Sequence, residues 1–160
     1  MAKTRSKNPT AVDLLKEDHD KVKKAFKEFE KMDHADTATT QELVRSVCED
    51  LRVHTMLEEE IFYPAVREAI EDEDIMNEAA VEHETAKMLI DQLENMGADD
   101  PNYVATFTVL GEYVMHHVKE EEGEMFPQAK KAKELDLEAL GERMRARKEE
   151  LMAGQEKAAA

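Results

Sequence analysis

Histidine and glutamate recur at a fixed spacing in two stretches of the chain. The first, HTMLEEEIFYP, spans residues 54–64, and the second, HVKEEEGEMFP, spans residues 117–127. In both, a glutamate follows the histidine by four positions and a proline follows it by ten. Residues four apart lie on one face of a helix, so the imidazole and the carboxylate can point at one centre. Such pairs could ligate metal ions, or they could belong to two solvated acidic helices.

The composition favours long helices that would carry these pairs. The 160 residues include only 5 Gly and 4 Pro, and 38% of them are charged, which suits amphipathic helices in a single domain. The net charge of −16 argues against nucleic acid and anionic membrane surfaces as partners. A lone cysteine, Cys48, excludes an internal disulfide, and no apolar run reaches the length of a membrane span. We therefore expect a cytoplasmic protein.

Apolar residues recur every three or four positions in five segments, which predicts five helices. We expect them at about residues 10–32, 40–70, 74–96, 101–127 and 136–153. Pro64 and Pro127 should kink or end the second and fourth helices, because proline removes a backbone hydrogen bond.

The predicted fold class is all-α, an antiparallel up-down four-helix bundle with an additional short C-terminal helix. The bundle should occupy residues 11–132. A disordered tail is expected before it, at residues 1–10, and the C-terminal helix with a frayed tail after it, at residues 133–160.

Two further histidines extend the repeat. His19 and His83 are 64 positions apart, and His54 and His117 are 63 apart. All four lie on the apolar stripe of their own predicted helix, as do the glutamates of the two stretches. With a rise of 1.5 Å per residue, each histidine lies roughly 20 to 24 Å from the helix end that joins its neighbour. One layer of the bundle would then hold four imidazoles and two carboxylates.

Buried carboxylates need a positive partner, because burying them unpaired costs several kcal/mol each. A pair of divalent metal ions bridged by the glutamates would supply it, and imidazole with carboxylate suits iron as well as zinc or manganese. The ferritin-type spacing, with Glu three positions before His, is absent, because Leu51 and Val114 occupy those positions. The predicted metal ligands are His19, His54, Glu58, His83, His117 and Glu121.

These residues resemble the hemerythrin-like family, also called the HHE cation-binding domain. The resemblance rests on the two repeated stretches, on EDHDKV around His19 and on VEHETAKML around His83, and it covers about residues 11–130. It implies an antiparallel four-helix bundle with two non-haem iron ions joined by an oxo or hydroxo bridge. The assignment it implies is His19 and His54 on one iron, His83 and His117 on the other, and Glu58 and Glu121 as bridges.

The chain departs from the family pattern at one position. Oxygen-carrying hemerythrins have a fifth histidine one turn from that of the third helix, where this chain has Ala79 and Lys87. One iron would then have more open coordination, which favours a reactive or sensing site over oxygen transport. The carriers also take one bridge from the position that Glu122 occupies here, so Glu122 stays an alternative to Glu121.

Three functions remain open from the sequence. The first is a non-haem di-iron protein that binds O2, NO or peroxide for sensing, binding or detoxification. The second is a catalase-like or peroxidase-like di-iron enzyme, and the third is a metal-free helical module that binds a protein partner. The redox or protein partner is not specified by the sequence. We expect His34 to be solvated, His116 to have a supporting or surface role, and Tyr63 to line the core.

Overall fold

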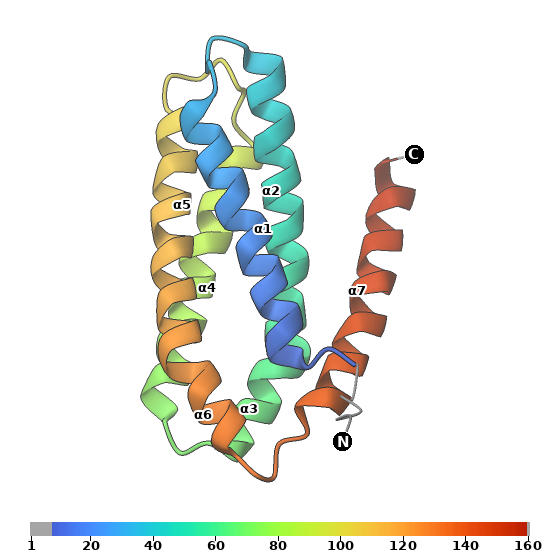
Figure 1. The fold of residues 1–160 in the computed structure, drawn as a ribbon. Coiled ribbons are helices and arrows are strands. Elements are labelled where there is room, and N and C mark those ends of the chain that lie inside the picture. The colour runs from blue at the N-terminus through green and yellow to red at the C-terminus, as the bar shows by residue number, and fades with distance from the viewer. Residues whose placement is uncertain (1–7, 160) are drawn as a thin grey trace, which may run out of the picture.

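The computed structural model describes residues 8–159, which form helices and connecting turns without a strand. Four long helical segments run up and down in a bundle, and a further helix lies outside it (Figure 1). The α-helices are α1 (Ala11–Lys31), α2 (Thr37–Leu57), α3 (Tyr63–Ala69), α4 (Glu73–Glu94), α5 (Tyr103–Glu120), α6 (Phe126–Lys131) and α7 (Leu137–Ala159). Two π-helical turns, η1 (Glu58–Phe62) and η2 (Glu121–Met125), interrupt the second and fourth segments. The predicted all-α bundle is confirmed.

A disordered tail is expected at residues 1–10, and its residues 1–7 lie outside the described residues. Residues 8–10 lie against α7, where the Asn8 side-chain amide donates to Glu142 at 3.4 Å. Thr10 then begins α1 through a capping box, because its hydroxyl accepts from Asp13 N–H at 3.2 Å and Asp13 accepts from Thr10 N–H at 3.0 Å.

Hydrogen bonds to two aspartate side chains accompany helix starts that differ from the predicted positions. Helix α2 begins at Thr37, because Asp36 accepts a hydrogen bond from the Thr39 N–H at 3.1 Å and caps the helix earlier than expected. Helix α5 begins at Tyr103, because Asp100 accepts from the Asn102 N–H at 2.8 Å and holds the preceding residues in a turn.

The prolines of the repeated stretches follow π turns. Tyr63 N–H donates to the Glu58 carbonyl and Phe126 N–H donates to the Glu121 carbonyl, both across five positions. The wider turn accommodates the next residue, a proline in each case, whose ring would clash with the carbonyl four positions earlier in a regular helix. The expected kink or break is therefore replaced by a π turn followed by a further α-helical stretch, α3 or α6.

The apolar core has two clusters, one on each side of a polar layer. One cluster contains Leu15, Phe62 and Met76, and the other contains Phe26 and Phe107. Along each long segment, the buried histidine or glutamate falls between residues of the two clusters. The layer is thus shielded from water by hydrocarbon above and below it.

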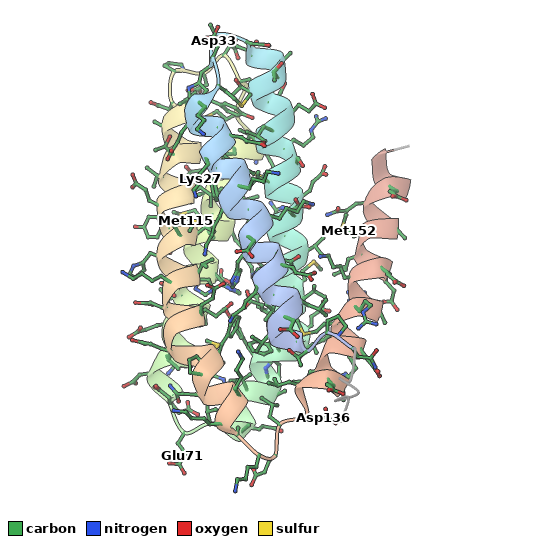
Figure 2. The ribbon with its side chains drawn as sticks, viewed as in Figure 1. Lys27, Asp33, Glu71, Met115, Asp136 and Met152 are labelled. Atoms are coloured by element: carbon green, nitrogen blue, oxygen red, sulfur yellow. The ribbon has the colours of Figure 1, made fainter. Side chains whose placement is uncertain are left out.

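The additional C-terminal helix, α7, has 23 residues and extends to Ala159, beyond the predicted end near residue 153. It packs against α1, α2 and η1, and its Leu140 and Met144 are buried. A Cβ on Gly141 would lie 2.6 Å from the Pro9 carbonyl oxygen, so only glycine allows this close approach. Met152 lies between α7 and the bundle (Figure 2).

None of the described helices is both long enough and apolar enough to cross a lipid bilayer.

Candidate metal centre

The structure brings all six predicted ligand residues into the polar layer. They form two groups whose nitrogen and oxygen atoms lie within 4.8 Å of one another, and all six side chains are buried. The groups are His19, His54 and Glu121, and Glu58, His83 and His117. Each group has two kinds of ligand atom, imidazole nitrogen and carboxylate oxygen, and could hold a metal ion.

Glu58 of η1 lies between imidazoles of both groups. Its Oε1 is 2.8 Å from Nε2 of His54, one turn earlier, and 3.4 Å from Nε2 of His83 on α4. Since the two imidazoles belong to different groups, this carboxylate can reach both cation positions.

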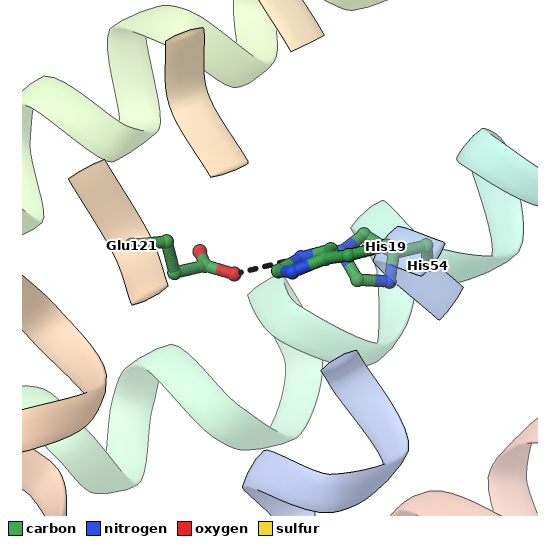
Figure 3. Close-up of side chains that lie close together, drawn as sticks. All are labelled: His19, His54 and Glu121. Carbon is green, nitrogen blue, oxygen red and sulfur yellow. Dashed lines mark ion pairs between the residues drawn. The ribbon is translucent and has the colours of Figure 1, made fainter. Parts of the chain in front are cut away.

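Glu121 of η2 repeats this arrangement from the opposite segment. Its Oε1 lies 3.2 Å from Nε2 of His19, and its Oε2 lies 3.1 Å from Nε2 of His117. Figure 3 shows Glu121 approaching the His19 ring, with His54 beside it; the two ring centroids are 4.9 Å apart. Each of the two carboxylates thus contacts one imidazole from each group.

A carboxylate outside the layer faces the Nδ1 atom of each histidine. The pairs are His19–Glu122 at 3.0 Å, His54–Asp18 at 3.0 Å, His83–Glu59 at 3.5 Å and His117–Glu82 at 2.9 Å. Because an ionised carboxylate only accepts, Nδ1 of His19, His54 and His117 donates outward and their Nε2 lone pairs face the layer. Nδ1 of His83 lies beside Glu59 but makes no hydrogen bond within the described residues. Glu122 therefore contacts the outer edge of His19, whereas Glu121 reaches the layer.

The inner side of the layer is rich in acceptors. Both carboxylate oxygens of Glu58, Oε1 of Glu121 and Nε2 of His19 have no hydrogen-bond partner within residues 8–159. Neutral imidazole lone pairs facing carboxylate oxygens repel each other, and burial prevents water from separating them. A positive charge in the layer removes this cost, and either protons or metal ions can supply it.

The histidine pKa values show how strongly the layer favours positive charge. Burial lowers the pKa of His54, but the charge of Glu58 beside Nε2 and the hydrogen bond to Asp18 outweigh burial and raise the pKa to about 10. Burial likewise opposes the rise at His117, where Glu121 and Glu82 raise the pKa to about 11. The pKa of Glu58 lies well below its usual value despite burial, because His54 stabilises the carboxylate.

Tyr63 is a site residue that the sequence reasoning assigned to the core wall. Its hydroxyl donates to Oε2 of Glu121 at 2.5 Å and lies 3.1 and 3.2 Å from Nε2 of His83 and His117. Burial and the charges of the two glutamates raise its pKa well above the usual value, so the phenol keeps its proton. The hydroxyl is an additional polar group beside the histidine pair that lacks the fifth histidine.

The π turn explains why Tyr63 was missed. In a regular helix, residues 58 and 63 would point in different directions, but the five-residue hydrogen bond of η1 brings Tyr63 nearly one turn after Glu58. The proline at position 64 was the available signal, because a proline inside an apolar helical pattern requires a local change of helix geometry. Phe126 holds the equivalent position after η2 and stacks on His19 with the ring centroids 5.9 Å apart.

The remaining candidates lie away from the layer. Lys87 points outward and donates to Glu59 at 2.7 Å. His116 is exposed and forms a third group of potential ligands with Glu82 and Glu120 at the surface, which agrees with the role expected for it. His34 is partly buried instead of solvated, because its ring stacks on Phe29 and its Nε2 contacts the Phe29 carbonyl at 2.7 Å.

Burial raises the pKa of the Cys48 thiol to about 12, so this side chain is a protonated core residue and not a nucleophile.

A small cavity borders the layer on the side of the second apolar cluster. Its volume is about 40 Å³, which is enough for a few atoms the size of water. Apart from the four imidazoles, its lining is mostly apolar and includes Val22, Leu51, Ala86, Val114 and the half-exposed Tyr113. A small molecule could reach the imidazoles here, whereas a large substrate would not fit.

Comparison with known proteins agrees with this architecture. A curated relative, a DNA nickase from Nostoc sp. (strain PCC 7120 / SAG 25.82 / UTEX 2576), is 31% identical over 114 residues, 71% of this chain but only 32% of the relative. A crystal structure of a hemerythrin HHE cation binding domain-containing protein from Mycobacterium kansasii shares the fold, with a TM-score of 0.75 and 24% identity over 91% of this chain and 88% of that chain. The family model of the hemerythrin HHE cation binding domain matches residues 10–129, and the chain therefore belongs to this family of cation-binding proteins.

Proposed function

We propose that the chain is a non-haem di-iron protein that binds O2, NO or peroxide at an open coordination position. His19 and His54 hold one iron, His83 and His117 hold the other, and the two glutamates bridge them. The bound irons supply the redox chemistry and the position for the small ligand. The protein supplies the donor atoms, a buried layer and restricted access.

The observation that carries the proposal is the position of Glu58 and Glu121 between the two histidine pairs. Each carboxylate approaches an imidazole of either pair within 3.4 Å, and three of their four oxygens have no hydrogen-bond partner within the described part of the chain. A bridged pair of cations satisfies these oxygens and the Nε2 lone pairs together. The donor set of imidazoles and carboxylates without a thiolate fits iron.

The cavity supports a ligand of two or three atoms. A volume of about 40 Å³ and an apolar lining suit a diatomic molecule or peroxide. Tyr63 does not line this cavity; its hydroxyl lies 3.1 Å from His83 Nε2 on the side of the first apolar cluster and donates to Glu121. Sensing, binding or detoxification of such a molecule are the uses that this site supports.

A catalase-like or peroxidase-like activity is the second candidate, and Tyr63 favours it. A peroxide held at the His83–His117 pair would lie beside the Tyr63 hydroxyl, which could hydrogen-bond to it in place of Glu121. Oxygen release from peroxide by the iron-loaded protein, compared with its Tyr63→Phe variant, tests this activity. Release no faster than that caused by free iron would contradict it.

DNA nicking by the Nostoc relative is not part of the proposal. This chain matches 32% of that protein's length, and its own net charge of −16 repels phosphates. We propose small molecules as its ligands, not nucleic acid or membranes. Its single cysteine fits a reducing, cytoplasmic environment.

Metal analysis after anaerobic reconstitution with ferrous iron tests the proposed function. We expect about two iron ions per chain and, after oxidation, a near-ultraviolet band from a bridged pair. Removing iron with a chelator should lower the melting temperature, because ligands bound to the native state stabilise it. A chain that retains fewer than about one iron and melts equally with or without chelator would instead fit the metal-free interaction module.

A further inference from the structure

A basic side chain contacts each of the four outer carboxylates. The pairs are Lys23–Glu122 at 3.8 Å, Lys148–Asp18 at 2.7 Å, Lys87–Glu59 at 2.7 Å and His116–Glu82 at 3.7 Å. Three of these basic side chains come from α1, α4 and α5, which are helices of the bundle itself. Lys148 alone comes from α7, the helix outside the bundle.

Three consecutive contacts connect Lys148 to the centre of the layer. Its Nζ donates to Asp18 Oδ1 at 2.7 Å, and Asp18 Oδ2 accepts from His54 Nδ1 at 3.0 Å. Nε2 of the same imidazole lies 2.8 Å from Glu58 Oε1. Asp18 is 15% exposed, so the charge that Lys148 offers reaches it with little screening by water.

Other contacts seat α7 independently of Lys148. Leu140 and Met144 are buried, and Gly141 lies against the backbone before α1. The neighbouring Arg147 donates to Glu60 of η1 at 2.8 Å. Glu60 contacts no histidine of the layer in the described structure, so Arg147 anchors α7 without reaching an imidazole.

We propose that Lys148 is a positioning residue of the metal centre, acting through Asp18 to orient His54. The proposal rests on the proposed function, in which His54 is a metal ligand. If Lys148 has this role, metal binding at His19 and His54 depends on the docking of α7 against the bundle. Metal binding at His83 and His117 depends only on residues of the bundle.

The physical reason lies in the carboxylate between them. A hydrogen-bonded carboxylate fixes the tautomer and the ring orientation of a ligating histidine and adjusts its strength as a donor. Lys148 holds Asp18 in the rotamer that faces His54 and withdraws charge from it. Because coupling between two events is reciprocal, metal binding at this position must also favour the docked position of α7.

The test compares Lys148→Met with Lys148→Arg and Arg147→Met. The first removes the cation, the second preserves it, and the third removes the neighbouring anchor of the same helix. Lys148 is 42% exposed, so the fold should tolerate all three variants. Lys87→Met serves as a matched control in the other half, because Lys87 donates to Glu59, whose Oε1 lies 3.5 Å from Nδ1 of His83.

The first measurement uses the metal-free protein with its histidine rings labelled with ¹⁵N. We expect Lys148→Met to shift the ring nitrogen resonances of His54, with the other histidines unchanged, and Lys148→Arg to restore them. Arg147→Met should leave His54 unchanged. If Lys148→Met leaves His54 unchanged, or if Arg147→Met shifts it equally, the proposal is wrong.

The second measurement follows iron release from the protein to a chelator. We expect Lys148→Met to accelerate one release phase by roughly tenfold and leave the other unchanged, as is typical when a hydrogen-bonded support of a ligand is lost. Lys87→Met should accelerate the other phase. Equal acceleration of both phases by Lys148→Met would overturn the proposal. A chain that binds no iron would contradict the proposed function, while the nitrogen resonances would still decide whether Lys148 positions His54.

Discussion

The two halves of the polar layer are built by the same repeated stretch, yet they present different groups to a ligand. In the His83–His117 half, the residue after the π turn is Tyr63, whose hydroxyl contacts both imidazoles within 3.2 Å. In the other half, the equivalent residue is Phe126, which stacks its ring on His19. A hydroxyl therefore distinguishes two positions whose histidines and glutamates are equivalent.

The two halves also differ in the residues that contact their histidines from outside the layer. His54 is supported by a lysine of α7, whereas the supports of His83 and His117 come from the bundle. The repeat thus gives each half its ligands, and residues outside the repeated pattern make the halves unequal. Changes to the shared ligands should accordingly have the largest effects, and changes to the residues that differ should have smaller ones.

Glu58→Gln should have the largest effect, because Glu58 contacts imidazoles of both halves. We expect iron affinity to fall more than roughly 100-fold at both positions, beyond the loss typical of an outer support. Metal analysis after reconstitution measures this, with Glu60→Gln as the control for an exposed glutamate of the same turn. Loss of one iron only would show that the halves bind metal independently.

The metal-free protein should lose stability as pH rises. The folded-state pKa values of about 10 for His54 and about 11 for His117 lie above the usual value near 6.5, so their contribution is complete below about pH 6.5 and is lost by about pH 11. Glu58 acts in the opposite direction: its lowered pKa adds stability above its usual value, and this stability is lost in acid. Urea unfolding at several pH values measures the trend.

Iron loading should reverse this dependence on pH. Metal ions replace the protons on the histidines, so iron binds more tightly as pH rises. The difference in unfolding free energy between the loaded and metal-free proteins should therefore widen from about pH 6.5 toward pH 9. A constant difference across this range would mean that the histidines are not the groups that exchange protons for iron.

Tyr63→Phe should make the His83–His117 half resemble the His19–His54 half, in which Phe126 holds the equivalent position. The variant removes the hydrogen bond that Tyr63 donates to the buried carboxylate of Glu121. We therefore expect the unfolding free energy of the metal-free protein to fall by about 1.5–3 kcal/mol. The optical spectrum of the iron-loaded variant should also change. Tyr103→Phe is the control, because Tyr103 is buried in the second apolar cluster, away from the layer. An effect no larger than that of Tyr103→Phe would contradict the role of Tyr63.

The sequence was sufficient to predict the bundle and the six residues of the layer, because both depend on periodicity. The three- and four-residue steps of the apolar stripe place His19 and His83 inward, and the repeated spacing of His and Glu does the same for the other members. Helix geometry favoured Glu121 over Glu122, since four residues complete about one turn, and the structure places Glu121 in the layer and Glu122 at the Nδ1 atom of His19.

The features that periodicity does not encode were missed. The π turn before Pro64 changes the direction of Tyr63. A proline inside a helical pattern is usually interpreted as the end of the helix, so the pattern alone did not predict this turn. The supports Asp18 and Lys148 are 130 positions apart, and nothing in the local pattern connects them. The length of α7 was underestimated because its C-terminal residues have no apolar stripe, although they continue the helix.

The smallest predicted effect concerns the cavity above the two halves. Val22 and Ala86 occupy equivalent positions in the repeat and both line the cavity, so the smaller alanine leaves more space over the His83–His117 half. Ala86→Val should weaken NO binding to the iron-loaded protein by about tenfold, the lower range for one or two methyl groups in an apolar pocket. Val22→Ala should leave the affinity unchanged or raise it slightly. Titration with NO, followed optically, compares the two variants, and equal weakening by both would mean that the ligand does not favour the half that carries Tyr63.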